Sequence, residues 1–99
     1  MRDPETLELV KKSLAELAAK VPGRAIEVRV PPYAAIQCGD GPTHTRGTPP
    51  NTIEMSAPTW LALASGELSW EAAVDSGAVA ASGTRADLAP YLPLNRIIC

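Results

Sequence analysis

One long amphipathic segment at the start of the chain constrains the fold most. Asp3 is a good helix cap, Pro4 suits the first helical position, and Pro22-Gly23 ends the segment. Apolar residues recur along one face at a spacing of three and four: Leu7, Val10, Leu14, Leu17 and Val21. At 1.5 Å per residue such a helix is about 27 Å long, close to the width of a small domain. We therefore expect it to lie across the rest of the fold as a major layer.

The other face of this segment is charged. Glu8 precedes Lys12 by four residues, and Glu16 precedes Lys20 by four, which is the spacing of ion pairs on a helix surface. We therefore expect this face to be solvated.

Three strands are predicted between residues 26 and 55. Ile26, Val28 and Val30 alternate with charged residues, which is the period of a strand with one buried face. Residues 33–38 predict a second strand, and the short connection through Pro31-Pro32 favours antiparallel pairing with the first. Residues 52–55 predict a third strand.

The second half of the chain predicts short helices and one more strand. Ser56 caps a helix that runs to about residue 64 before Gly66, and Ser69 caps another that ends at Gly77. Residues 79–82 predict a fourth strand, and Thr84 opens a last helical turn or two through residue 91. The whole chain, 1–99, is thus predicted to be one α+β domain with a mainly antiparallel sheet of about four strands.

Composition excludes several classes of function. A net charge of −2 lacks the basic surface of a nucleic-acid binder. No apolar stretch approaches the roughly 18 residues that span a bilayer, and the charged N-terminus does not resemble a signal peptide. We therefore expect a cytoplasmic protein with Cys38 and Cys99 reduced. These two cysteines and His44 lack the clustered spacing of a zinc site, so no metal or cofactor is predicted.

Three glycine-punctuated segments carry a family resemblance. They are Trp60-Leu61-Ala62-Leu63-Ala64-Ser65-Gly66, Leu68-Ser69-Trp70-Glu71-Ala72-Ala73-Val74 and Gly77-Ala78-Val79-Ala80-Ala81-Ser82-Gly83. Together they resemble the C-terminal half of the sterol-carrier-protein (type two) family, and residues 49–55 look like its short bacterial branch. The resemblance implies a curved sheet covered by helices, enclosing an apolar tunnel for lipids, fatty acyl groups or sterols. Similar domains also serve as accessory domains of larger enzymes.

The size of the chain limits that tunnel. An apolar ligand pocket is at least about 300 Å³. At roughly 24 cal/mol per Å³, an empty one costs on the order of 7 kcal/mol, whereas a domain of this length has about 5–15 kcal/mol of stability in total. We therefore expect an open groove and not a closed tunnel.

The candidate ligand-binding residues fall into an apolar and a polar set. The apolar candidates are Met55, Trp60, Leu63, Trp70, Leu88 and Leu92, with Val74 beside them. Their alternative role is that of ordinary core residues, which is the better expectation for most of them. The polar candidates are His44 and Arg46, in the Gly- and Pro-rich loop 39–51, where Arg46 would bind a carboxylate or phosphate head group. The alternative is a solvated loop.

Binding is favoured over catalysis. His44 with Cys38 suggests a nucleophile pair, but no orienting acid is placed beside them and Cys38 lies in an apolar strand. No catalytic residue is therefore predicted. The first hypothesis is a bacterial sterol-carrier-like protein that binds an apolar or amphipathic small molecule. The alternative is an accessory or interaction domain that supports an enzyme or its own homodimer without a lipid.

Overall fold

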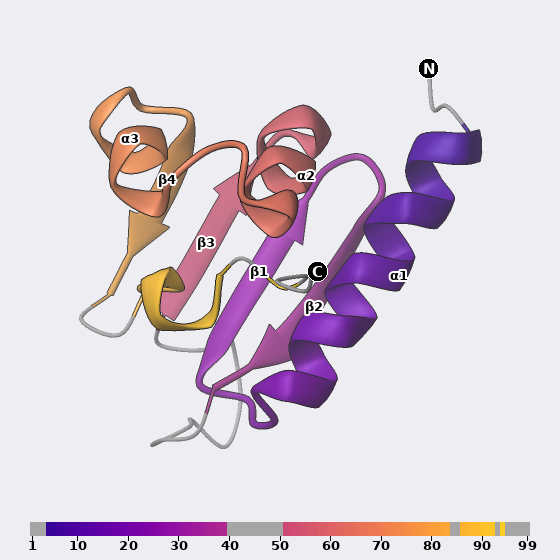
Figure 1. Ribbon diagram of the computed structural model, residues 1–99. Coiled ribbons are helices and arrows are strands. Elements are labelled where there is room, and N and C mark those ends of the chain that lie inside the picture. The colour runs from indigo at the N-terminus through magenta and orange to yellow at the C-terminus, as the bar shows by residue number, and fades with distance from the viewer. Residues whose placement is uncertain (1–3, 40–50, 84–85, 93, 95–99) are drawn as a thin grey trace.

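The computed structural model describes residues 4–39, 51–83, 86–92 and 94, which form helices on one side of a four-stranded sheet (Figure 1). The fold class predicted from the sequence, α+β, is confirmed. In chain order the elements are α1 (Pro4–Lys20), β1 (Ile26–Val30), β2 (Ala34–Cys38), β3 (Asn51–Met55), α2 (Ala57–Ser65), α3 (Trp70–Asp75), β4 (Val79–Ser82) and the 3₁₀ turn η1 (Ala89–Tyr91).

The sheet is mixed, with strand order β2-β1-β3-β4. The predicted hairpin is confirmed, because β1 pairs antiparallel with β2 and places Val28 opposite Ile36. β3 runs parallel to β1, with Ile53 beside Val28, and β4 returns antiparallel to β3. Two of the three strand pairs are therefore antiparallel, as expected.

One face of the sheet is buried under the helices. Val28, Val30 and Ile53 point to this face and are fully buried. From the helix side, α1 contributes Val10, Leu14 and Leu17, which were all predicted to lie on its buried stripe. α1 lies closest to β2 and α2, so it forms a layer across the β2 side of the sheet (Figure 1).

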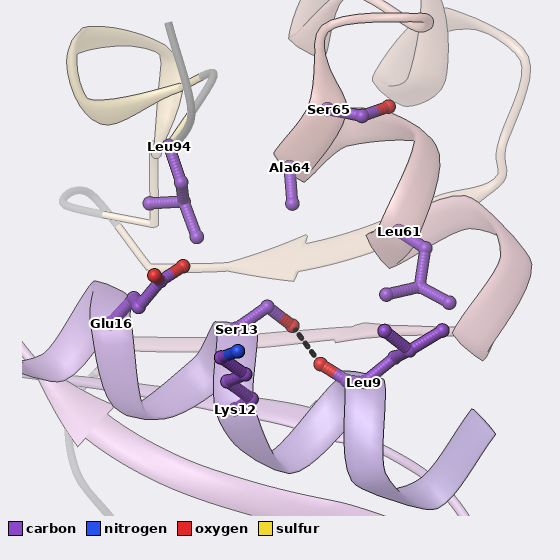
Figure 2. A pocket seen from close by; sticks show the side chains of 8 residues that line it. All are labelled: Leu9, Lys12, Ser13, Glu16, Leu61, Ala64, Ser65 and Leu94. Carbon is purple, nitrogen blue, oxygen red and sulfur yellow. Dashed lines mark hydrogen bonds between the residues drawn. The ribbon is translucent and has the colours of Figure 1, made fainter. Parts of the chain in front are cut away.

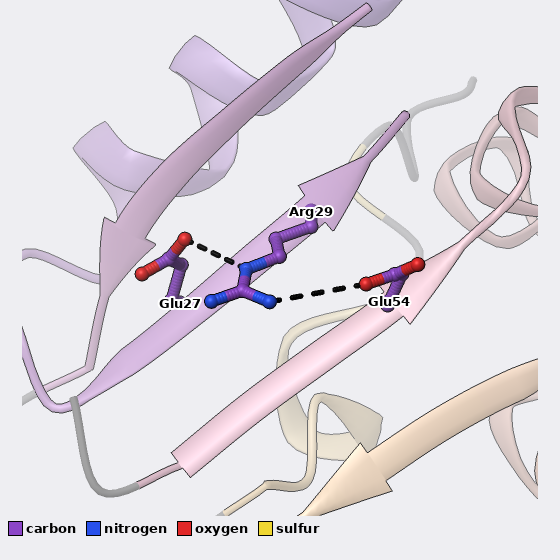
Figure 3. A network of polar contacts seen from close by, with 3 residues as sticks. All are labelled: Glu27, Arg29 and Glu54. Atoms are coloured by element: carbon purple, nitrogen blue, oxygen red, sulfur yellow. Dashed lines mark hydrogen bonds and ion pairs between the residues drawn. The ribbon is translucent and has the colours of Figure 1, made fainter. Parts of the chain in front are cut away.

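The opposite face of the sheet is open and carries charge (Figure 3). Arg29 Nε lies 2.8 Å from a Glu27 carboxylate oxygen, and Arg29 Nη1 lies 3.9 Å from Glu54. The hydrogen bond and the negative charge of Glu27 raise the pKa of Arg29. Exposed ion pairs of this kind stabilise a protein little, so the fold depends on the helix-covered face.

The predicted helix caps are present where the structure describes them. The Ser56 hydroxyl accepts a hydrogen bond from the Thr59 N–H at 3.3 Å, and the Ser69 hydroxyl accepts one from Ala72 at 3.1 Å. Gly66 ends α2 with φ +90°, a left-handed conformation in which a Cβ would be strained. The expected caps Asp3 and Thr84 lie outside the described residues.

The last predicted helix is present as one turn, and it begins later than expected. In the described residues it is a single 3₁₀ turn, Ala89–Tyr91. Asp87 accepts a hydrogen bond from the Ala89 N–H at 2.9 Å, and Pro90 has no N–H with which to extend a helical ladder.

Leu14 and Leu9 give a matched test of this packing on one helix. Leu14 is fully buried, so Leu14→Ala should lower the free energy of unfolding by about 2–5 kcal/mol. Leu9 is 55% exposed, and Leu9→Ala should change it by no more than about 0.5 kcal/mol. Urea denaturation followed by circular dichroism measures both. Equal losses for the two variants would contradict this placement of α1.

Candidate functional site

The described residues 86–92 and 94, called the C-terminal segment, divide the helix-covered side of the molecule. Leu88 is fully buried and anchors the segment in the core. Lys20 Nζ donates a hydrogen bond to the Tyr91 carbonyl oxygen at 3.0 Å, and the Leu94 N–H donates one to the Ala64 carbonyl oxygen at 3.0 Å. The segment therefore runs between α1 and the end of α2, with an open groove on each side.

The first groove lies between α1 and α2 and is called the α1–α2 groove (Figure 2). Its volume is about 300 Å³. Leu9 and Leu61 point toward each other at one end, whereas Leu94 lies near Glu16 at the other end. The full lining consists of Leu9, Lys12, Ser13, Glu16, Leu61, Ala64, Ser65 and Leu94.

A partly buried hydrogen bond fixes the wall of this groove. Trp60 is fully buried, and its Nε1–H donates to the Ser13 hydroxyl oxygen at 2.7 Å. The Ser13 hydroxyl in turn donates to the main chain of α1, with the Leu9 carbonyl oxygen at 2.7 Å. The Ser13 hydroxyl therefore both donates and accepts a hydrogen bond within the protein. Polar contacts to a ligand would then come from the charged groups of Lys12 and Glu16 at the rim.

The second groove, called the α2–α3 groove, lies on the other side of the C-terminal segment. It has a volume of about 350 Å³. Its lining consists of Leu63, Gly66, Leu68, Ser69, Trp70, Glu71, Ala89 and Leu92. Three residues predicted to bind ligand, Leu63, Trp70 and Leu92, therefore come together here.

The other predicted site residues lie elsewhere. Met55, Trp60 and Leu88 belong to the buried core, which was the alternative weighed for them. Val74 lies on α3 and is 39% exposed. His44 and Arg46 lie outside the described residues, as does most of the loop 39–51. A role in ligand binding remains a prediction for each of these residues.

Sequence reasoning missed the α1–α2 groove. Its rim uses Lys12 and Glu16, which are exposed, as expected for the solvated face of α1. One signal was available, because Leu9 is an apolar residue outside the predicted buried stripe of that helix. The position of α2 alongside this face is a tertiary contact, and residue spacing along α1 gives no information about it.

Where a tunnel was considered, between α1 and the sheet, apolar side chains fill the space. Val10, Leu14 and Leu17 of α1 and Cys38 of β2 are all fully buried there. Both grooves, in contrast, open at the surface. The chain thus keeps a well-packed interior and avoids the cost of a large empty cavity.

Cys38 has the environment of an inert thiol. It is fully buried, and desolvation raises its pKa to about 11. A thiol is nucleophilic as its thiolate, which this environment disfavours. Among the residues that the structure describes, His, Cys, Asp and Glu form no group of three that could hold a metal ion. No helix in the same part of the chain is long and apolar enough to cross a membrane.

Comparison with known families agrees with this architecture. A family model described as "Bacterial SCP ortholog" matches residues 3–94. The chain belongs to this family. The sterol-carrier-like resemblance of residues 59–83 is therefore confirmed at the level of the family and extends over nearly the whole SCP-like domain. No curated protein matches the chain.

Ser13→Ala tests the hydrogen bond between Trp60 and Ser13. The substitution leaves the indole N–H of Trp60 without its partner, so it should lower the free energy of unfolding by about 1–3 kcal/mol. Ser65→Ala is the control, because its exposed hydroxyl bonds to the Ala62 carbonyl oxygen and its loss should cost less than about 0.5 kcal/mol. Chemical denaturation measures both. A Ser13→Ala chain as stable as the control would show that the bond is unimportant.

Cys38 should be unreactive in the folded protein and sensitive to pH in its effect on stability. In a Cys99→Ser background, iodoacetamide should alkylate Cys38 rapidly only after denaturation. The folded thiol keeps its proton to a higher pH than the unfolded one. The contribution of Cys38 to the free energy of unfolding should therefore fall as pH rises above 9. Denaturation of this chain and its Cys38→Ala variant across that pH range measures the difference. Fast alkylation without denaturant would contradict the burial.

Proposed function

We propose that this SCP-like domain is a non-enzymatic binding protein for a lipid, a fatty acyl compound or a sterol-like molecule, held in the α1–α2 groove. The observation that carries the proposal is the open apolar lining formed by Leu9, Leu61 and Leu94 (Figure 2). Membership of the family supports an apolar ligand, because sterol-carrier-like domains are carriers for such molecules.

Covering this lining would supply the binding free energy. Burial of a leucine side chain from full exposure is worth about 1.5–3 kcal/mol. Leu9 is already partly covered and is 55% exposed, so a ligand that covers it should gain about 1 kcal/mol from that contact. Leu61 and Leu94, which are half-buried, add to the same surface.

The polar end of an amphipathic ligand would lie at Lys12. This residue supplies the positive charge of the described groove lining, and the neighbouring Ser13 hydroxyl is already bonded to Trp60. A carboxylate or phosphate head group is therefore the complement to this rim. Glu16, one helical turn away, would disfavour a head group placed at the opposite end.

The lining supports binding without catalysis. Its two hydroxyl groups, on Ser13 and Ser65, donate to main-chain carbonyl oxygens within their own helices. Within the described part of the chain, neither is hydrogen-bonded to a general base in the way that an activated nucleophile is.

A matched pair of substitutions tests the location of the ligand. Leu9→Ser removes apolar surface from the groove and should weaken binding of a long-chain fatty acid about fivefold, which corresponds to about 1 kcal/mol. Val74→Ser removes a comparably exposed apolar side chain from α3, outside this groove, and should leave the affinity unchanged. Isothermal titration calorimetry at low protein concentration measures both. Equal effects of the two substitutions would exclude the α1–α2 groove as the site.

The two tryptophans distinguish the two grooves. Trp60 senses the α1–α2 groove through its hydrogen bond to Ser13, whereas Trp70 lines the α2–α3 groove. A fatty acid in the first groove should change the fluorescence of a Trp70→Phe chain and leave a Trp60→Phe chain nearly unchanged. The reverse result would move the ligand to the α2–α3 groove. Calorimetry that detects no binding of fatty acids, lysophospholipids or sterols would contradict the proposed function itself.

A further inference from the structure

Among the residues that the structure describes, β4 is an edge strand of the sheet that no other element covers. It pairs with β3 on one side and is the last strand in the order β2-β1-β3-β4. Ala80, Ala81 and Ser82 are all exposed, and Val79–Ser82 contains neither charge nor proline. Lysine, proline and other charged residues are the usual protection of an edge strand against further pairing.

The opposite edge of the sheet differs. β2 lies beside α1, which covers this side of the sheet (Figure 1). Cys38 of β2 is fully buried, and Ala34 and Ile36 are half-buried. Of the two edge strands, β4 is therefore the one whose side chains leave room for another strand.

We propose that β4 pairs antiparallel with β4 of a second copy of this chain, which joins two four-stranded sheets into one. This pairing is self-complementary. A two-fold axis through Ala80 places Ala80 opposite its own copy, Val79 opposite Ala81, and Ala78 opposite Ser82, so no like charges meet and no large side chains clash. Pairing of β4 with β2 of another copy would instead leave one edge free at each end and form an open-ended filament. The contact of α1 with β2 also hinders the approach of another strand to β2.

Exposed apolar surface lies beside this edge. Val74 on α3 is 39% exposed, and α3 packs on β4. Val74 lines neither of the two grooves. Covering part of α3 would add apolar burial to the main-chain hydrogen bonds of the paired strands.

The dimer should be weak and should strengthen with salt. A four-residue strand falls short of the roughly 800 Å² per partner that stable interfaces bury. The charged residues of α3, Glu71 and Asp75, are both acidic, so the two copies repel mildly. Added salt screens charges farther apart than about 8 Å and should raise the association constant.

Sedimentation equilibrium with full-length variants tests the proposal. Wild-type chain should shift from 10.4 kDa toward twice that mass as its concentration rises from micromolar to millimolar. Ala81→Lys places a charge at the seam and should weaken association at least tenfold. Ala35→Lys is the matched control, because it places the same charge at an exposed alanine of β2 and should leave association unchanged.

Hydrogen exchange on the wild type gives a second measurement that needs no substitution. Amides within residues 79–82 should exchange more slowly at the higher protein concentration, while those of residues 34–38 should not change. A wild-type chain that stays at 10.4 kDa would overturn the proposal. Association that survives Ala81→Lys with unaltered exchange in β4, or that is lost only with Ala35→Lys, would overturn it as well.

Discussion

The contact between α1 and α2 centres on the buried indole of Trp60, and the accessible surface of the helix layer depends on it. The chain has no phenylalanine, so this indole is the largest fully buried side chain among the described residues. Its N–H needs a partner when it is removed from water, and Ser13 supplies one. The hydrogen bond therefore fixes the position of α2 along α1. Leu9 of α1 and Leu61 of α2 then become walls of the α1–α2 groove.

A small side chain explains why the α1–α2 groove stays open. Ala64 faces α1 across the groove, where a larger residue would have filled the space. Leu14 and Leu17 of α1, in contrast, pack the interface with the sheet. A chain of 99 residues has little stability to spare for an internal void. Apolar surface placed in an open groove avoids that cost, because water occupies the space until a ligand displaces it.

The sequence predicted local structure well, but it did not predict which helices lie side by side. Periodic spacing located the buried stripe of α1, and serine and glycine positions located both ends of α2, because these signals act within a few residues of each other. The same spacing placed Lys12 on a solvated face, where it is indeed exposed, but spacing contains no information about which element lies beside that face. Trp60 was weighed both as a ligand anchor and as a core residue, and spacing alone could not show that it is fully buried and bonded to Ser13. The site residues in the loop 39–51 lie outside the described part of the chain.

The two outward-facing features lie at opposite ends of the strand order, which separates their functions. The α1–α2 groove is on the β2 side of the sheet, whereas the proposed seam is at β4. In a dimer joined through β4, the two α1–α2 grooves would lie on the outer flanks and would bind ligand independently. The α2–α3 groove borders the seam, because Trp70 and Val74 share the six-residue helix α3. A ligand there would be coupled to association through α3, so independence of ligand affinity from protein concentration points to the α1–α2 groove.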